Sequence, residues 1–181
     1  SVAFVFCMGA QVGGISHLFN RAETSFGLST AALAIQVLTL ASISGRLLGG
    51  WIVMYVPIRG FSIGCALLQG LGLGIIGVAD SPALLLLGAG CFGAALGNLL
   101  MLHPLWLSEV FGNKDYPRIF ALSNAISVIG VASGPFVLGF VHDGFSYSAS
   151  YLTASSLALF AVSIFVFSRS TSQPVSSPVQ Q

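Results

Sequence analysis

One arginine, Arg46, lies inside a long apolar stretch of the sequence that runs from Leu28 to Gly60. It is the only charged residue between Thr30 and Pro57. At about 1.5 Å per residue, a helix over this stretch covers roughly 40 Å, enough to cross a hydrocarbon core of roughly 30 Å with some tilt. A guanidinium at mid-depth in a membrane costs from about 2.5 to about 17 kcal/mol, so Arg46 is expected to contact a wet cavity or a partner.

Arg46 has polar and small neighbours on the same side of the predicted helix. They recur at three- and four-residue spacing, which places them on one face: Thr39, Ser42, Gly49 and Gly50. The guanidinium offers a planar fork of donors that matches a carboxylate, and Thr39 and Ser42 could complete the hydrogen bonds. The other interpretation is structural, with Arg46 holding neighbouring backbone carbonyls.

Other polar residues of the apolar segments are candidates for the same site. Asn98, Asn124 and Gln11 could form hydrogen bonds with a polar solute. Ser127 lies on the same helix face as Asn124. His17 could change its charge between about pH 5 and 8 and serve proton coupling or an outer gate, or it could be a neutral histidine bonded to a carbonyl.

Three further polar residues lie near the inner ends of predicted helices. Glu109 and Arg118 flank the longest loop, where they could form a surface contact or a gate. Such a pair contributes little to stability when it is exposed to water. His103, directly before Pro104, is interpreted as a structural residue at a helix end.

The composition indicates an integral membrane protein. Of 181 residues, 55% are hydrophobic and 6% are charged, and the mean hydropathy is +0.94. A soluble domain has roughly 25% charged residues. Several apolar runs of helix length exclude a signal peptide before a soluble domain, and they exclude the short alternating strands of an outer-membrane barrel. The net charge of +1 gives no reason to expect nucleic acid as a partner.

The residue types also argue against a catalytic, metal or cofactor site. Acidic residues occur only at the ends of the predicted helices, so a membrane enzyme is not expected. An arginine at mid-depth opposes a cation channel. The three cysteines, Cys7, Cys65 and Cys91, lie in apolar runs without the spacing of metal ligands, and are interpreted as small core residues.

Six membrane-spanning helices are predicted, which makes the chain an all-α membrane protein. The first ends at a polar loop, 20–23, and the longest loop, 108–117, follows the fourth. A bundle over residues 1–168 is expected to precede a disordered cytoplasmic tail, 169–181, which is too polar to bury. The helices are expected over residues 2–19, 28–56, 61–79, 83–107, 118–141 and 149–167.

Basic residues predict the orientation of the bundle. If the first helix starts inside, the inner segments hold Arg59, Lys114, Arg118 and Arg169, and the outer loops hold only Arg21. Both termini are therefore expected on the cytoplasmic side of the plasma (inner) membrane. Because the chain starts without Met and almost directly with a membrane span, an upstream part is expected to be missing.

Glycine pairs predict where helices pack closely. Small residues allow close backbone approach, which drives helix association in lipid. Gly130-x-x-x-Gly134 in the fifth predicted helix and Gly93-x-x-x-Gly97 in the fourth are such pairs. Pro135, directly after Gly134, permits a bend where a neighbouring helix or cavity water takes up the freed carbonyl.

Three motifs together resemble the C-terminal half of a major facilitator superfamily transporter. One is similar to the end of the family's eighth helix and the loop after it, one to the loop joining the tenth and eleventh helices, and one to the eleventh helix and its outer loop. They are Gly45-Arg-Leu-Leu-Gly-Gly-Trp51 to Arg59, Glu109-Val-Phe-Gly to Arg118-Ile-Phe-Ala-Leu-Ser-Asn124, and Gly130-Val-Ala-Ser-Gly-Pro-Phe-Val-Leu-Gly139 with His142-Asp143-Gly144.

This resemblance implies a six-helix bundle built from two three-helix units, 1–80 and 81–168, related as an inverted repeat. It also implies transport by alternating access together with a missing N-terminal six-helix half. The expected partners are that half, the lipid bilayer and a small organic anion.

Within the superfamily, the lone arginine before Leu-x-Gly-Gly looks most like the monocarboxylate transporters and the oxalate/formate antiporters, where it engages the substrate carboxylate. Ser42 replaces the acid that the monocarboxylate transporters carry four residues earlier, and the stretch Met54–Arg59 keeps only the last basic residue of the family's loop motif. The expected function is secondary active transport of mono- or dicarboxylates. The alternatives are transport of another solute (drug efflux or sugar) and a non-transporting membrane scaffold.

Overall fold

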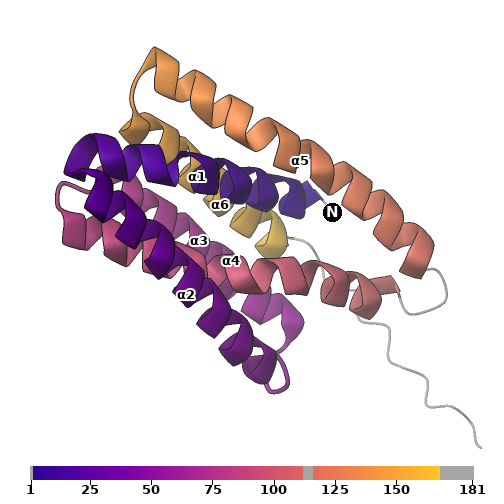
Figure 1. Cartoon of the computed structure of the whole chain (residues 1–181). Helices are drawn as coiled ribbons and strands as arrows, with labels where there is room; N and C mark the ends of the chain where they lie inside the picture. The colour runs from indigo at the N-terminus through magenta and orange to yellow at the C-terminus, as the bar shows by residue number, and fades with distance from the viewer. Residues whose placement is uncertain (1, 112–115, 168–181) are drawn as a thin grey trace, which may run out of the picture.

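The protein folds into six α-helices, and their membrane-spanning character confirms the predicted fold class. The computed structural model describes the backbone of residues 2–111 and 116–167, and their side chains except those of 109–111. All six helices in these ranges are long and apolar enough to cross a membrane, and no strand occurs in them. The helices are α1 (Val2–Phe26), α2 (Leu28–Ile52), α3 (Ile58–Val78), α4 (Pro82–Phe111), α5 (Tyr116–Gly144) and α6 (Tyr147–Phe167) (Figure 1).

The first helix is longer than the hydropathy pattern predicts, and Arg21 is not in a loop. α1 continues through residues 20–23 to Phe26, and the Arg21 side chain is only 8% exposed. Its Nη2 donates a hydrogen bond of 3.1 Å to the carbonyl of Ala79, just after α3, and its Nη1 donates to Ser25. Because the last carbonyls of a helix lack intrahelical donors, a buried arginine is accommodated there.

Other helix boundaries also differ from the prediction, most of them because the helix is longer than expected. The backbone of α4 is helical to Phe111 and α5 begins at Tyr116, so both helices continue into the segment that was expected to be a loop, 108–117. α2 ends earlier than expected, at Ile52. The expected disordered tail, 169–181, lies outside the described residues.

One glycine makes the short connection between the first two helices. Gly27 is the single residue between α1 and α2, and its φ of 89° lies in the region that favours glycine. A side chain at this position would strain the backbone although no neighbouring atom would obstruct it. The link therefore reverses the chain within one residue.

Glycines bring α2 and α4 into backbone contact, as the spacing of Gly93 and Gly97 predicts. A Cβ on Gly93 would overlap the carbonyl of Leu38, and one on Gly97 would overlap the carbonyl of Ser42. From the other side, a Cβ on Gly45 would lie 2.5 Å from the carbonyl oxygen of Ala94. Neither helix can carry a larger side chain at these positions without moving away from the other.

A matching contact joins α1 and α5. A Cβ on Gly130 would overlap the carbonyl of Val5, and one on Gly134 would overlap the carbonyl of Gly9. On α1, a Cβ on Gly13 would lie 2.9 Å from the carbonyl oxygen of Gly134. The predicted packing role of the Gly130–Gly134 pair is thus confirmed.

The two glycine contacts are related by a regular offset in the sequence. Gly130 and Gly134 of α5 follow Gly45 and Gly49 of α2 by 85 residues, and Gly93 and Gly97 of α4 follow Gly9 and Gly13 of α1 by 84. The helix pairs correspond as well, because α2 packs on α4 as α5 packs on α1, and α3 packs on α4 as α6 packs on α1. This correspondence agrees with two three-helix units in an inverted repeat.

Hydrogen bonds to backbone carbonyls, two of them buried, hold α6 to its neighbours. Tyr151 of α6 is fully buried and donates from its hydroxyl to the carbonyl of Gly14, at 2.7 Å. Ser155 donates to the carbonyl of Gly70 on α3, also at 2.7 Å. At the other end of α6, Arg59 donates to the carbonyl of Val166, at 2.7 Å. Serine, tyrosine and arginine side chains thus fasten α6 to α1 and α3.

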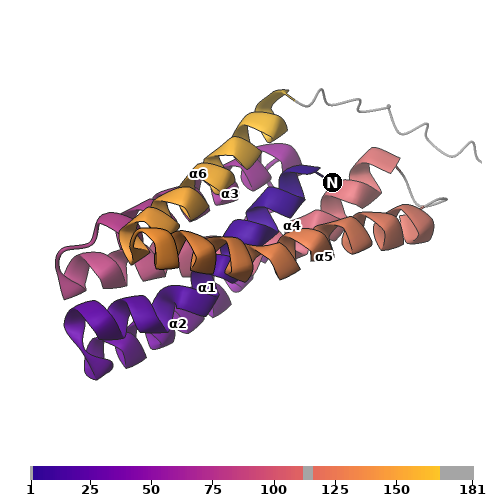
Figure 2. The same ribbon diagram turned by 90° about the horizontal axis from the view of Figure 1, so that it is seen from above.

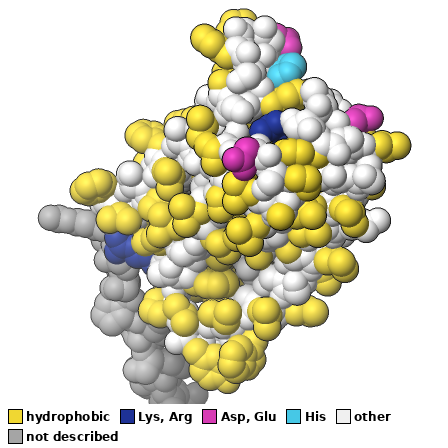
Figure 3. All heavy atoms as spheres, turned by 90° about the vertical axis from the view of Figure 1, so that its left-hand side faces the viewer, with side chains coloured by type: hydrophobic (Ala, Val, Ile, Leu, Met, Phe, Trp, Pro, Cys, Tyr) yellow, Lys and Arg dark blue, Asp and Glu magenta, His cyan; other side chains and the backbone are white. Residues whose placement is uncertain are grey.

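The remaining surface is mostly apolar. Seen from above, α2 and α5 lie along the outside of the bundle (Figure 2), and α2 and α5 are the least buried of the six helices. Figure 3 shows hydrophobic side chains spread over one face of the molecule, with the acidic and histidine side chains gathered toward its upper end. Of the cysteines, Cys7 and Cys65 are buried and Cys91 is partly buried, and all three are free thiols.

Candidate functional site

Arg46 lies on α2 beside the glycine contact with α4, and its side chain is exposed. A Cβ on Gly97 of α4 would lie 2.9 Å from Cγ of Arg46, so the aliphatic stem of the arginine runs over the bare backbone of Gly97. Although α2 ends six residues after Arg46, Gly97 is close to the middle of α4. The guanidinium therefore extends from the middle of the bundle.

The guanidinium of Arg46 has neither an ion pair nor a hydrogen bond with any residue that the structure describes. This distinguishes it from two other arginines. Arg21 and Arg59 both donate to backbone carbonyls near helix ends. Arg46 is thus a cation without a carbonyl partner in the part of the chain that is described.

The two residues of α2 that were predicted to accompany Arg46 differ in their exposure. Thr39 is exposed on α2, and its hydroxyl donates to the carbonyl of Ile35 at 2.8 Å, which leaves its oxygen able to accept. Ser42 is buried, and its backbone contacts Gly97. Thr39, Ser42 and Arg46 therefore share one side of α2, with Ser42 turned toward α4.

Asn98 is placed inside the α2–α4 contact and not on the exposed side of the helices. Its side chain is 6% exposed, its Nδ2 donates to the carbonyl of Ala94 at 3.0 Å, and its Oδ1 packs on Gly49 without a hydrogen-bond partner. A buried carbonyl oxygen without a partner costs about 1–3 kcal/mol.

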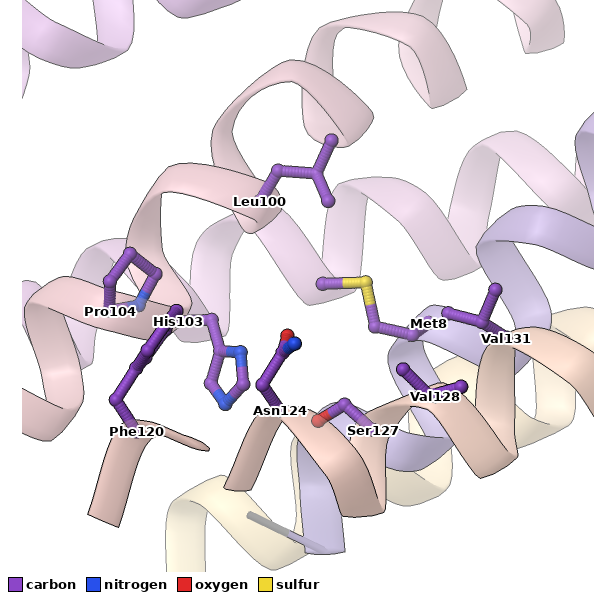
Figure 4. A pocket seen from close by; sticks show the side chains of 9 residues that line it. All are labelled: Met8, Leu100, His103, Pro104, Phe120, Asn124, Ser127, Val128 and Val131. Carbon is purple, nitrogen blue, oxygen red and sulfur yellow. The ribbon is translucent and has the colours of Figure 1, made fainter. Parts of the chain in front are cut away.

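A cavity of about 180 Å³ lies between α1, α4 and α5. It contains two of the residues that the sequence singled out, Asn124 and Ser127, which point into it from α5 (Figure 4). Most of the wall is apolar, including Met8 of α1, Leu100 of α4 and Val128 of α5. Arg46 and Asn98 are not part of the lining, so the structure groups the candidate residues in two places.

His103 belongs to the cavity wall, and its prediction as a helix-end residue is wrong. It lies eight residues before the last residue of α4, Phe111, because the helix continues through Pro104. Its Nε2 is 2.9 Å from Oγ of Ser123 on α5, and its ring centroid is 4.4 Å from that of Phe4. His103 thus ties α4 to α5 beside the cavity.

Two prolines leave backbone carbonyls of cavity-lining residues without their usual helical donor. Pro104 and Pro135 both lie inside helices. A proline has no N–H for the carbonyl four residues earlier, and the residues that lose this donor are Leu100 and Val131. Both line the cavity. Its wall therefore includes two residues whose carbonyls have no donor at the usual helical position.

The cavity side of α5 corresponds residue by residue to the Arg46 side of α2. With the 85-residue offset of the glycines, Asn124 corresponds to Thr39, Ser127 to Ser42 and Val131 to Arg46. Polar residues match polar residues at the first two positions. At the third, a cation on α2 is matched by a small apolar side chain on α5.

Gln11 and His17 lie on α1, in different surroundings. Gln11 is 2% exposed and its Oε1 has no hydrogen-bond partner. His17 is half-buried, and its Nε2 lies 3.2 Å from the carbonyl oxygen of Pro135. A Cβ on Gly139 would lie 3.7 Å from the His17 ring. His17 therefore joins the C-terminal halves of α1 and α5, and Gln11 is a buried amide with a free acceptor.

The contact predicted between Glu109 and Arg118, across the connection from α4 to α5, cannot be tested with the described residues. Arg118 is exposed near the start of α5, and the side chain of Glu109 lies outside the described residues. Among the described residues, the one basic–acidic side-chain contact within 4 Å joins Nδ1 of His142 and Oδ1 of Asp143, at 3.1 Å, at the end of α5. No group of three or more His, Cys, Asp and Glu that could hold a metal ion occurs in the same part of the chain.

Sequence reasoning foresaw the carbonyl freed by Pro135, but it missed Ser123, the carbonyl freed by Pro104 and the cavity itself. The 85-residue correspondence of α2 and α5 was visible in the sequence and would have paired Asn124 and Ser127 with Thr39 and Ser42. The contact between His103 and Ser123 depends on how α4 and α5 pack. No spacing in the sequence indicates it.

Comparison with known families identifies the chain at the level of a superfamily. The sequence profile of the Major Facilitator Superfamily matches residues 1–181. Among the curated proteins, none matches this chain. A transporter superfamily agrees with six membrane-spanning helices and with the expectation that the protein is not an enzyme. The chain belongs to the Major Facilitator Superfamily.

Proposed function

We propose that this protein transports small organic anions, mono- or dicarboxylates, by secondary active transport with alternating access, and that Arg46 binds their carboxylate. The observation that supports this most is the exposed guanidinium of Arg46 without a partner among the described residues, at the middle of a membrane bundle. Such a cation gains most from an anion, because pairing offsets the cost of holding it in a medium of low dielectric constant.

The other arginines argue against a structural role for Arg46. An arginine that stabilises helix ends contacts carbonyls, as Arg21 and Arg59 do. The described contact of Arg46 is instead the passage of its stem over Gly97, which leaves the guanidinium free. A neutral sugar or a cationic drug would leave this charge without compensation.

The transport cycle requires a second bundle. Alternating access moves two bundles around a central site, and this chain supplies one six-helix bundle. The missing N-terminal half would then cover the exposed sides of α2 and α5. The chain would lie in the plasma (inner) membrane with both termini in the cytoplasm, as the distribution of basic residues indicates.

An uptake screen on the full-length protein tests this function. Proteoliposomes are loaded and assayed with radiolabelled mono- and dicarboxylates, a neutral sugar and a cationic dye, for the wild type, Arg46→Lys and Arg46→Gln. Carboxylate uptake is expected in the wild type, reduced uptake in Arg46→Lys, which keeps the charge but loses the planar fork, and almost none in Arg46→Gln.

The screen also separates the alternatives. Uptake of the sugar or the dye without any carboxylate uptake would show a transporter of another solute. If no solute is taken up by a correctly inserted protein, the scaffold interpretation is supported. Full carboxylate uptake by Arg46→Gln would return Arg46 to a structural role.

A further inference from the structure

The cavity between α1, α4 and α5 adjoins the Arg46 side of the bundle. On α4, Leu100 lines the cavity and lies three residues after Gly97, over which the stem of Arg46 passes. Residues three apart are neighbours on a helix surface, with about 5–6 Å between their Cβ atoms. Leu100 therefore lies between the cavity and the part of α4 that the stem of Arg46 covers.

The size of the cavity matches a compact organic group. It measures about 180 Å³. For comparison, an engineered apolar cavity of about 150 Å³ in another protein stays dry and binds benzene. A group of about six carbons, aromatic or branched, thus fits the cavity between α1, α4 and α5.

The lining has an apolar part and a polar edge. Met8, Leu100 and Val128 provide apolar contacts. Asn124 points inward and has no hydrogen-bond partner among the described residues, and the hydroxyl of Ser127 donates to the carbonyl of Ser123 and can still accept. This lining suits a mainly apolar group whose hydrogen-bonding substituents lie at the polar edge.

The correspondence of the two three-helix units explains why the charge of Arg46 lies outside the cavity between α1, α4 and α5. Arg46 on α2 matches Val131 on α5, so only one of the two equivalent positions carries a cation. Val131 lines the cavity that Arg46 does not enter. The two corresponding positions therefore differ in chemistry: position 46 suits the anionic end of a solute and position 131 suits an apolar end.

We propose that this cavity binds the non-polar body of the transported carboxylate, an aromatic or branched aliphatic group of about six carbons, while Arg46 binds the carboxylate. The proposal rests on the proposed function and narrows its substrate class to amphipathic carboxylates. Val128, on the cavity wall, then limits the size of the non-polar group that the cavity can accept.

Two carboxylates that differ only in their non-polar group test the proposal. Lactate and phenyllactate share a 2-hydroxycarboxylate head, and phenyllactate adds a six-carbon ring. Uptake of both is measured in proteoliposomes of the full-length protein for the wild type and Val128→Phe, which adds a bulky side chain at the cavity wall. We expect phenyllactate uptake to fall at least about tenfold and lactate uptake to change less than about twofold, as for loss of a hydrophobic contact worth about 1–3 kcal/mol.

Val137→Phe is the matched control. Val137 is an exposed valine on the same helix, nine residues further on, and it does not line the cavity. The same substitution there should leave the ratio of phenyllactate to lactate uptake unchanged. If Val128→Phe does not reach the membrane, Val128→Leu is expected to shift the ratio in the same direction by a smaller factor.

The outcomes distinguish this inference from the function on which it rests. If Val128→Phe lowers the uptake of phenyllactate and of lactate equally, or does not lower phenyllactate uptake, the inference is wrong. The proposed function still stands in either case if lactate uptake depends on Arg46. Wild-type protein that takes up neither probe and no other carboxylate overturns the proposed function and the inference together.

Discussion

Arg46 of α2 and Val131 of α5 occupy equivalent positions in the two three-helix units. Each directly follows a glycine whose backbone packs on a neighbouring helix, Gly45 on Ala94 of α4 and Gly130 on Val5 of α1. Because the glycines fix the rotation of both helices, the side chain that follows is turned out of the glycine contact in each case. The same backbone position thus presents a cation in one unit and an apolar group in the other.

The close contact between α2 and α4 predicts that Gly97 tolerates no side chain. Gly97→Ala would bring a Cβ into the Ser42 carbonyl and to 2.9 Å from Cγ of Arg46, so α2 must shift. Overpacking of this kind costs about 1–3 kcal/mol. We expect a thermal midpoint several degrees lower in detergent and weaker carboxylate uptake.

Gly64→Ala provides the control for this substitution. Gly64 is exposed on α3, and a Cβ there has no atom within 4 Å. It should therefore keep the wild-type midpoint. Equal midpoints for both alanine variants would show that α2 and α4 are not in the close contact described.

Tyr151 is predicted to stabilise the bundle through its hydroxyl. Tyr151→Phe keeps the ring and removes the 2.7 Å hydrogen bond to the carbonyl of Gly14. Hydrogen bonds between membrane helices are worth about 0.6–2 kcal/mol, so the thermal midpoint should fall measurably. Tyr55→Phe, at a tyrosine that is 72% exposed, should not change it. A midpoint for Tyr151→Phe as high as that of Tyr55→Phe would contradict the bond.

His17 is predicted to act through its hydrogen bond to the carbonyl of Pro135. Glutamine can still donate such a bond and leucine cannot. His17→Gln should therefore retain more uptake and a higher thermal midpoint than His17→Leu. If proton coupling is the role of His17, both variants lose proton-driven accumulation alike while exchange continues, and this result would replace the structural interpretation.

Labelling with a membrane-impermeant thiol reagent tests the orientation. In a background with the three native cysteines replaced by alanine, Glu23→Cys and Asp80→Cys should react from outside and Gly60→Cys and Arg118→Cys only after permeabilisation. All four positions are exposed. Arg21→Cys should react slowly from either side, because Arg21 is buried. Fast labelling at Arg21, or both loops of α3 on one side, would refute the topology.

The number and type of the helices could be predicted from the sequence because apolar runs of sufficient length have one stable arrangement in lipid. The glycine contacts were predictable for the same physical reason, since close approach in lipid depends on small residues. The Gly93–Gly97 and Gly130–Gly134 pairs are found in those contacts.

The surroundings of individual polar residues were less predictable. Residues 20–23 look like a loop by hydropathy, yet Arg21 is a buried helical residue that donates to the carbonyl of Ala79, 58 residues away. His103 looks like a helix end because a proline follows, yet α4 continues and presents it to Ser123. In both cases a contact with a residue distant in the sequence determines the surroundings of the side chain, and the local sequence does not indicate that contact.

The affinity of the purified full-length protein for a carboxylate, with and without Arg46, tests the central claim most directly. Binding of phenyllactate is measured by titration calorimetry for the wild type, Arg46→Lys and Arg46→Gln, each checked for a wild-type thermal midpoint. Hydrogen bonds to charged groups are worth about 1.5–3 kcal/mol, so Arg46→Gln should bind at least about tenfold more weakly, with Arg46→Lys between the two. Equal affinity in the wild type and Arg46→Gln would contradict the account.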